Sequence, residues 1–485
     1  MMPKIVILPT DIVIAMLIAA IIGYVFAVSR SEELQERWRY VFSQTGALIS
    51  MTVLTVFLAV AAVDSVHYRS VIDSSGPETV YDVAARSLLD DLLPERAMQQ
   101  EKSYSAPLAV MSFEKHSGIK DGVPVRDFEP LEAGSHLKDR KDHVSDVLTR
   151  AGAGLLIGAA LSLLAAAGFI AVALRRKQSA AAFFTAEEFR SSRIVWMTLS
   201  VLMLAFSIVF SLWPYYHVLG TDQTGNDILY QSLKSIRTAL VIGTLATASM
   251  LPFAVVLGIS AGFFKGRVDD VIQYIYTTLS SIPSVLLIAA SVLMIQVFID
   301  AHPGLYETGL ERSDMRLMML SLIIGMTGWA TLARLLRAET LKISQMDYVQ
   351  AARAFGSGSF TIMRRHIFPN VIHIVLIVAV LDFSSMVLYE AVLSYVGVGV
   401  DPTTYSFGSM INAGRLELSR TPVIWWNLAS AFAVMLSLVL SANVFAGVVR
   451  DAFDPRRSLV KPARKIVNNS VDKSDNSGEK EGAHA

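Results

Sequence analysis

Residues 347–370 read DYVQAARAFGSGSFTIMRRHIFPN, a polar and basic stretch in a chain whose other segments are mostly apolar. Asp347 stands where a helix N-cap residue would, and Gln350 follows three positions later, as in a capping box. Gly356 provides the left-handed residue that ends many helices. The stretch therefore predicts a short helix, a hinge and a second short helix that ends at Pro369. Such a knob between apolar segments can be gripped by a partner protein.

The overall composition points to a membrane protein. Of the 485 residues, 53% are hydrophobic and 17% are charged, whereas soluble domains carry roughly 25% charged residues. The chain has no cysteine, which excludes disulfides and cysteine-ligated metals, and its nine histidines show no metal-ligand spacing. The formal net charge of zero argues neither for nor against nucleic-acid binding.

Apolar segments long enough to cross a bilayer core recur along the chain. Three lie before residue 190, at 12–29, 46–63 and 151–174. Six more follow at 194–213, 238–264, 272–299, 317–336, 371–396 and 424–449. The sequence therefore predicts an all-α integral membrane protein with about nine transmembrane helices. Asp11 interrupts the first apolar segment, so a cleavable signal peptide is not expected.

The chain divides into five predicted parts. They are two N-terminal spans in 1–63, a small extracytoplasmic domain or loop in 64–150, a third span with a cytoplasmic interfacial connector in 151–193, a six-helix core in 194–457 and a disordered cytoplasmic tail in 458–485. Hydrophobic periodicity predicts amphipathic helices at 80–93 and 180–193.

Basic residues set the predicted orientation. They concentrate in 175–193, 265–267, 334–365 and 450–465, which all fall on one side of the six-span core. Because loops rich in Lys and Arg stay in the cytoplasm, that side is predicted to be cytoplasmic. The N-terminus and residues 64–150 are then outside.

The 347–370 stretch resembles the EAA loop of permease subunits of bacterial ABC importers. The resemblance rests on Gln350-Ala351-Ala352, on Gly356 and on the closing RHIFPN, with Gln350 in place of the usual Glu and Phe368 in place of the usual Leu. Further matching segments are LGTD at 219–222 with Gly225 and Asp227, AGFFKG at 261–266, WATLAR at 329–334, EAVLSYVGVG at 390–399 and RDAFDPR at 450–456. Together they cover residues 194–457, and the chain is identified as resembling the C-type permease subunit of dipeptide and oligopeptide importers. Residues 1–190 have no counterpart in that pattern.

The resemblance implies that the 347–370 loop docks onto an ATPase. The implied coupling residues are Asp347, Gln350, Ala351, Ala352, Gly356, Arg365 and Pro369. The implied partners are a second homologous permease, two ATP-binding-cassette ATPase subunits and a periplasmic substrate-binding protein, in the lipid of a bacterial inner membrane and without nucleic acid. The sequence contains no phosphate-binding loop of the GxxxxGK[ST] type. ATP and Mg are therefore expected on partner subunits, and this chain is expected to be no enzyme and to bind no cofactor or metal.

Two further sets of residues are candidate functional groups. Gly220, Asp222, Gly225 and Asp227 form a tight outer turn that serves either as an outer gate and binding-protein contact or simply as a turn, which favours Asp and Gly for their backbone habits. Asp382 and Glu390 lie within a predicted span, where ionisable residues are costly. They either line the translocation path or make hydrogen bonds between helices or, in the case of Glu390, cap the outer loop.

The function expected is ATP-driven import of di- and oligopeptides by alternating access. One alternative keeps this architecture but moves another solute, such as a nickel chelate, glutathione or an antimicrobial peptide. A secondary transporter or channel would require inverted repeats and interrupted spans, and no such repeat is evident. A third alternative is a membrane sensor or scaffold that uses residues 64–150.

Overall fold

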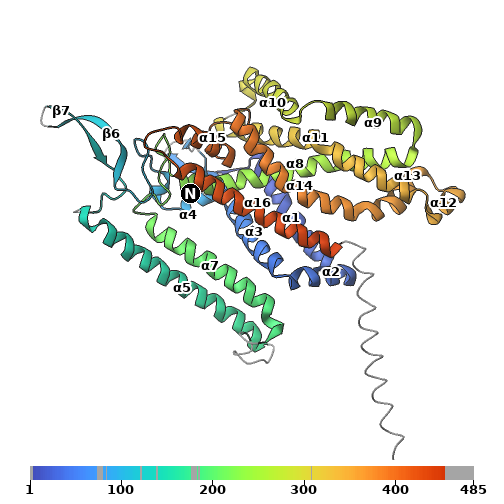
Figure 1. Cartoon of the computed structure of the whole chain (residues 1–485), viewed down its shortest axis with the longest axis horizontal. Coiled ribbons are helices and arrows are strands. Elements are labelled where there is room, and N and C mark those ends of the chain that lie inside the picture. Colours follow the sequence, from blue (N-terminus) through green and yellow to red (C-terminus); the bar gives the residue numbers. More distant parts are fainter. Residues whose placement is uncertain are drawn as a thin grey trace, which may run out of the picture.

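The computed structural model describes residues 4–73, 80–82, 85–120, 123–137, 140–175, 183, 186–306 and 308–453. In this part of the chain, nine helices are long and apolar enough to cross a membrane. They confirm the predicted all-α membrane class. Figure 1 shows them lying side by side along the long axis of the molecule, with smaller elements projecting at both ends.

The candidate spans lie close to the predicted segments. They are α1 (Pro9–Arg30), α3 (Thr45–Asp64), α5 (His143–Arg175), α7 (Arg190–Leu212), α8 (Ile228–Phe264), α10 (Ser284–Ala301), α11 (Gly309–Ile343), α14 (Phe368–Val396) and α16 (Trp426–Phe453). The shorter helices are α2 (Glu32–Ser43), α4 (Leu88–Leu92), α9 (Gly266–Ser281), α12 (Asp347–Ala354), α13 (Ser359–Ile362) and α15 (Phe407–Glu417).

The core of the molecule forms around α8. This helix packs along α11 over most of its length and also contacts α14 and α3. Side chains between these helices, such as Ile242, Leu336 and Val371, are completely buried. Because α3 also packs against α16, the N-terminal region is built into the core and does not stand beside it.

A hairpin of two helices, α5 and α7, lies on one side of the core (Figure 1). The two helices pack mainly against each other, and α7 also contacts α3. Their outer faces leave large apolar side chains such as Leu156, Leu164 and Val201 exposed. This is the surface expected of a helix that faces lipid.

The strands are short and belong to the region between α3 and α5, together with the N-terminal β1 (Lys4–Val6). They are β2 (His67–Arg69), β3 (Val71–Asp73), β4 (Val80–Tyr81), β5 (Arg86–Ser87), β6 (Met111–Lys120) and β7 (Val123–Pro130). β1, β2 and β5 form an antiparallel sheet, which ties the N-terminal residues to this region. The β6–β7 hairpin projects beyond the helices (Figure 1).

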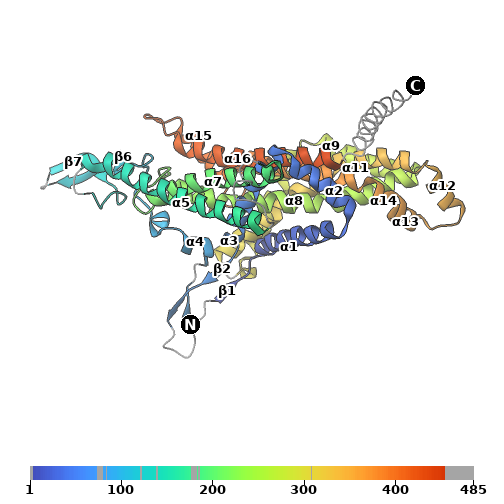
Figure 2. The same ribbon diagram turned by 90° about the horizontal axis from the view of Figure 1, so that it is seen from below.

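The two ends of the molecule carry different segments. Figure 2 places the N-terminus, β6–β7 and α15 at one end and α12 and α13 at the other. The guanidinium of Arg37 on α2 donates to the carbonyl of Phe453, the last residue of α16, at 3.4 Å, so α2 belongs to the α12 end. Of the segments predicted to be cytoplasmic, 30–39, 265–267 and 334–365 thus lie at the α12 end, whereas residues 454–485, which include the predicted tail, lie outside the described residues. The opposite end is called the outer end below.

Three predicted helices differ from the structure. The span predicted at 272–299 breaks into α9 and α10 because Ile282 precedes Pro283 and takes an extended conformation, φ −89° and ψ 131°. The helix predicted at 80–93 is helical only in α4, since its earlier residues pair as strands β4 and β5. Of the helix predicted at 180–193, residues 180–182 and 184–185 lie outside the described residues, and Glu187–Phe189 form a 3-10 turn before α7.

The region between α3 and α5, called the inserted region below, contacts the turn that contains Gly220 and Gly225, which is the predicted outer turn. The backbone N–H of Glu101 donates to the carbonyl of Gly225 at 3.0 Å, and the N–H of Thr221 donates to the carbonyl of Ser105 at 3.1 Å. Gly225 has a φ of +80°, and a Cβ added there would lie 1.8 Å from the Glu101 carbonyl oxygen. Only glycine fits this position, so the turn and the inserted region have to fold together.

Gly225→Ala should separate the inserted region from the outer turn. Left-handed backbone strain and the clash with Glu101 together should lower the free energy of unfolding by about 2 kcal/mol or more, measured by thermal unfolding in detergent micelles. Gly304→Ala is the matched control, because nothing lies within 4 Å of a Cβ at Gly304. Equal unfolding temperatures for the two variants would contradict this close contact.

Candidate functional site

The helix predicted to couple to an ATPase, α12, follows α11 after a three-residue turn. Its N-cap is Met346, and Asp347 is the first helical residue, so the predicted capping box does not form. The side-chain amide of Gln350 instead donates to the carbonyl of Ser344 at 3.0 Å. Gln350 therefore braces the end of α11, a task that a carboxylate could not perform because it has no donor.

The end of α12 is as predicted. Gly356 has a φ of +76°. Its N–H donates to the carbonyl of Arg353 at 3.0 Å, and the N–H of Ser357 donates to the carbonyl of Ala352 at 3.1 Å. This pair of bonds is the Schellman arrangement, which satisfies carbonyls at a helix end and turns the chain sharply.

The second helix of the loop does not end at Pro369, contrary to the prediction. α13 leads through a π-helical turn, Met363–Ile367, directly into the span α14. Pro369 is the second residue of α14. Arg365 lies exposed in the π-helical turn.

Buried contacts hold this loop rigidly against the spans. Val349, Ile362 and Ile367 are at most 1% exposed and belong to the main apolar core. The Arg353 guanidinium lies 5.0 Å from the centre of the Phe263 ring at the end of α8, a cation–π distance. The loop is thus fixed at both ends and in its middle.

Large apolar side chains cover the tip of the loop. Phe355 is 89% exposed and Phe360 is 70% exposed, on either side of the hinge, and Ala351 and Tyr348 are exposed on α12. Exposed apolar residues that are gathered at one place mark a protein contact more often than a free surface. The sequence prediction named the small residues here but missed the two phenylalanines, although both flank the glycine-rich hinge.

A cavity of about 470 Å³ lies among the candidate spans α10, α11 and α14 and the end of α9. Its apolar wall includes Ile288, Ile324 and Met386, and its polar groups are hydroxyls apart from one carboxyl group, that of Asp382. Asp382, Ser385 and Tyr389 lie three and four residues apart, which places them on one face of α14. Asp382 is half-buried and makes no hydrogen bond or ion pair with any described residue.

Glu390 lies elsewhere. Its side chain is 2% exposed, and it accepts a hydrogen bond of 2.6 Å from the hydroxyl of Ser394. A Cβ added to Gly408, in the first turn of α15, would lie 2.9 Å from its Oε1 atom. Glu390 is absent from the residues that line the 470 Å³ cavity. The bond to Ser394 lies within α14, so a hydrogen bond from Glu390 to another helix stays a prediction, whereas its position at Gly408 places it at the junction of α14 and α15.

The outer turn uses its acidic residues for backbone contacts. The Asp222 carboxylate accepts from the N–H groups of Thr224 and Asn226, both at 2.9 Å. The Asp227 carboxylate accepts from the N–H of Tyr230 at 3.0 Å and caps the N-terminus of α8. These bonds account for Gly220, Asp222, Gly225 and Asp227 as a turn, and their role as an outer gate stays a prediction.

A buried imidazolium lies beneath this turn. His217 Nδ1 lies 2.7 Å from Asp227 Oδ2, and its Nε2 lies 3.6 Å from Glu101 Oε1. Burial by itself lowers the pKa of His217, but the two carboxylates outweigh it and raise the pKa to about 9. Burial likewise raises the pKa of Glu101, and bonds from His217 and the N–H of Ala133 bring it below its usual value.

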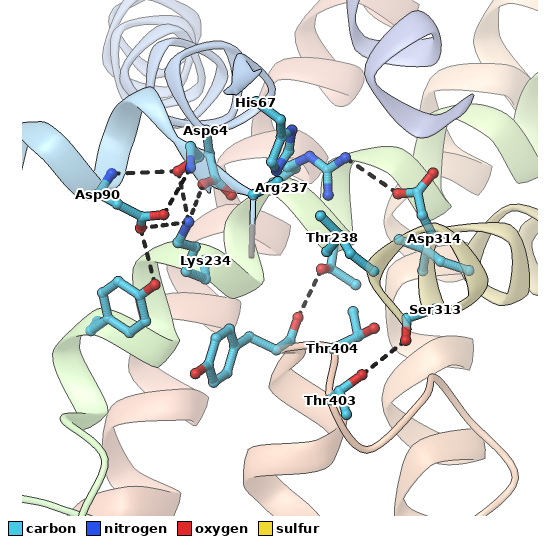
Figure 3. A pocket seen from close by; sticks show the side chains of 16 residues that line it. Asp64, His67, Asp90, Lys234, Arg237, Thr238, Ser313, Asp314, Thr403 and Thr404 are labelled. Carbon is cyan, nitrogen blue, oxygen red and sulfur yellow. Dashed lines mark hydrogen bonds and ion pairs between the residues drawn. The ribbon is translucent and has the colours of Figure 1, made fainter. Parts of the chain in front are cut away.

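A second cavity, of about 210 Å³, lies at the outer end (Figure 3). In it, Lys234 Nζ lies 2.7 Å from both Asp64 Oδ1 and Asp90 Oδ1. Burial raises the pKa of Asp90, but Lys234 lowers it below its usual value. These contacts hold α3 and α4 against the outer end of α8.

The neighbouring guanidinium of Arg237 joins three helices. Its Nη2 lies 2.6 Å from Asp11 Oδ1 on α1 and 3.4 Å from Asp314 Oδ1 on α11. His67 Nδ1 lies 3.0 Å from the other oxygen of Asp11. The charged side chains that line this cavity pair with one another. The cavity is therefore a structural junction between helices. The sequence held one signal for it, namely Asp11 in an otherwise apolar span.

The protonated His217 should make the outer turn sensitive to alkaline pH. Its pKa is about 9 in the folded chain and about 6.5 when unfolded. The stabilisation is therefore fully present below pH 6.5 and disappears as the pH rises through 9, up to about 3 kcal/mol for this shift. Thermal unfolding followed by fluorescence of the adjacent Trp213 should show this loss, and His217→Gln should be less stable at pH 7 and flat from pH 7 to 10. An equally steep decline in that variant would exclude His217 as the cause.

Comparisons with known proteins agree with this architecture. Residues 254–459 match the family described as binding-protein-dependent transport system inner membrane component. The chain is 30% identical over 242 residues to the dipeptide transport system permease protein DppC of Lactococcus lactis, covering 50% of this chain and 64% of that protein. It is 30% identical over 239 residues to the di/tripeptide transport system permease protein DppC of Pseudomonas aeruginosa, covering 49% of this chain and 72% of that protein.

A third relative gives the same result. The oligopeptide transport system permease protein OppC of Mycobacterium bovis is 28% identical over 249 residues, covering 51% of this chain and 79% of that protein. The matches thus cover about half of this chain and between 64% and 79% of the relatives. The chain is a multi-pass protein of the bacterial inner membrane, and it belongs to the family of permease subunits of dipeptide and oligopeptide ABC transport systems.

Proposed function

We propose that this chain is one half of the membrane pore of an ATP-driven importer that moves di- and oligopeptides into the cell. The relatives named above are permease proteins of peptide transport systems. The second half would be a homologous permease. Two ATP-binding-cassette ATPases would supply ATP hydrolysis, with ATP and Mg bound there, and a periplasmic substrate-binding protein would deliver the solute at the outer end.

The observation that carries the proposal is the rigid attachment of the coupling loop to two spans. α11 leads into α12 through a three-residue turn, and the π-helical turn continues α13 into α14 without a break. A force applied by a partner to the tip of this loop would move both α11 and α14, because the loop is packed rigidly against them and a packed core does not deform gradually. This is the mechanical property that an ATP-driven pore requires.

The cavity among the candidate spans supplies a path. α14 carries Asp382, Ser385 and Tyr389 into it, and α11 carries Thr327 and Thr331. The same two helices continue into the coupling loop. Alternating access would follow from their rocking against the second permease as the ATPases close. In this arrangement Asp347, Ala351, Ala352 and Arg365 face or flank the ATPase groove.

The path could also serve another solute. Nickel chelates, glutathione and antimicrobial peptides would use the same coupling machinery. The sensor alternative is less well supported, because the region between α3 and α5 is attached to the core at two places. Asp90 pairs with Lys234 on α8, and Glu101 bonds to Gly225 in the turn before α8. A sensor domain would need freedom to move relative to the core.

Gly356→Glu should abolish ATP-driven transport. The substitution forces a left-handed φ on a residue with a side chain and places a carboxylate on the apolar tip beside Phe355. Uptake of a labelled tripeptide by the complete complex in proteoliposomes should fall to background, whereas the affinity for the binding protein should not change.

Gly304→Glu is the control, since it adds the same carboxylate to an exposed turn at the opposite end, where nothing lies within 4 Å of a Cβ. Wild-type uptake by Gly356→Glu would refute the coupling role of α12. Co-purification of two ATPases and a second permease with this chain would establish the partners.

A further inference from the structure

The acidic residues of the candidate spans are almost all paired. Among the described residues, each of the following carboxylates pairs with a basic side chain or accepts a hydrogen bond from a hydroxyl group: Asp11, Asp64, Asp146, Asp300, Glu311, Asp314, Glu339, Glu390 and Asp451. Asp382 is the exception in this part of the chain. A carboxylate without a partner at membrane depth is costly, and such residues usually serve a solute or ion pathway.

The position of Asp382 places this unpaired carboxylate in a cavity. The cavity measures about 470 Å³, within the range of roughly 300–1,000 Å³ that small-molecule sites occupy. Tyr389 and Ser385, on the same face of α14, are both exposed. The buried side of α14 at this level carries Ser384 and Val387 instead. Asp382 thus lies on the same polar face of α14 as Ser385 and Tyr389, and this face is turned away from the core.

The lining of the cavity defines what would neutralise the carboxylate. It contains hydroxyls of Ser284, Thr327 and Thr331 and several apolar side chains, but no lysine, arginine or histidine. The guanidinium of Arg334 donates to the hydroxyl of Ser280, one of the lining residues, at 3.4 Å, and it also lies over the ring of Tyr276. The protein therefore provides acceptors here and leaves the cation to be supplied by the solute.

A metal ion is a poor fit to this lining. Divalent cations favour several carboxylate or carbonyl ligands, and no cluster of three or more acidic or histidine residues suited to a metal occurs among the described residues. A primary ammonium group fits better, because it donates three hydrogen bonds from one point charge. One carboxylate and neighbouring hydroxyls satisfy those donors, and the apolar wall accepts the rest of a peptide.

We propose that Asp382 is a specificity-determining residue that binds the free α-ammonium group of a peptide during its passage through the membrane. The inference rests on the peptide import proposed above. It predicts a preference within the path itself for solutes with a primary amine, in addition to any selection by the binding protein. Because α14 carries Asp382 and also continues into the coupling loop, movement of the loop would shift this binding group.

The test is uptake of two matched peptides by the complete complex in proteoliposomes, with the binding protein present throughout. Labelled Ala-Ala-Ala carries the ammonium group, and N-acetyl-Ala-Ala-Ala lacks it. Asp382→Asn should lower uptake of the free tripeptide about tenfold, the order expected for loss of one charge-assisted hydrogen bond, and should leave uptake of the acetylated peptide unchanged. Asp382→Glu should restore the preference, and Leu388→Ala, outside the cavity lining on the same helix, should keep it.

The outcomes separate the two proposals. If Asp382→Asn lowers uptake of both peptides equally, or of neither, the ammonium-binding role is wrong while peptide import stands. If the wild-type complex hydrolyses ATP but imports neither peptide, the proposed function fails and this inference fails with it. The absence of cysteine from the chain permits a second measurement: Asp382→Cys in the complete complex should react with a water-soluble thiol reagent, because the cavity is open to water. Lack of reaction would show that the site is closed to water and would overturn the inference.

Discussion

The low dielectric constant of the membrane forces charged side chains in the spans to find partners, and much of this architecture follows from that constraint. Arg237 and Lys234 lie on α8, the central helix, and their counter-charges come from Asp11, Asp64 and Asp90 in the first 90 residues and from Asp314 on α11. Removing one partner of such a buried pair typically costs about 3–5 kcal/mol. The N-terminal region is therefore an integral part of the six-helix core, even though the sequence motifs begin only after residue 190.

The sequence was sufficient where the signal is local. Runs of apolar residues gave the nine spans to within a few residues at most ends, and Gly356 marked the end of α12. The break at Pro283 had a local signal too, since a residue before proline leaves the helical region, but the apolar run on both sides hid it. The strands β4 and β5, at residues 80–81 and 86–87, were missed because their pairing partners, not their own pattern, determine them.

The three parts of the candidate site, namely the 347–370 loop, the outer-end ion pairs and the acidic residues of α14, were predictable from the sequence to different degrees. The coupling loop has a compact motif, so its residues could be named. The pairing of Asp11 with Arg237 joins residues 226 positions apart, and a single sequence carries no signal for such a contact. Asp382 and Glu390 looked equivalent in sequence, since both are acidic residues in one span. Only packing separates them: Glu390 points into the α14–α15 junction, whereas Asp382 points into a cavity.

A single helix, α14, connects the 347–370 loop with the cavity that contains Asp382. From Phe368 to Asp382, α14 rises about 21 Å at 1.5 Å per residue, and the described structure shows no break along this distance. Below Phe368 the chain continues through the π-helical turn to the exposed Phe360. At the other end of the molecule, the outer turn is bonded to the inserted region through Gly225 and His217. A contact made at either end of the molecule is therefore transmitted to α8, α11 and α14, the helices that pack together in the core. Under the proposed function, this connection would link the arrival of a solute at the outer end with movement of the helices that line the cavity.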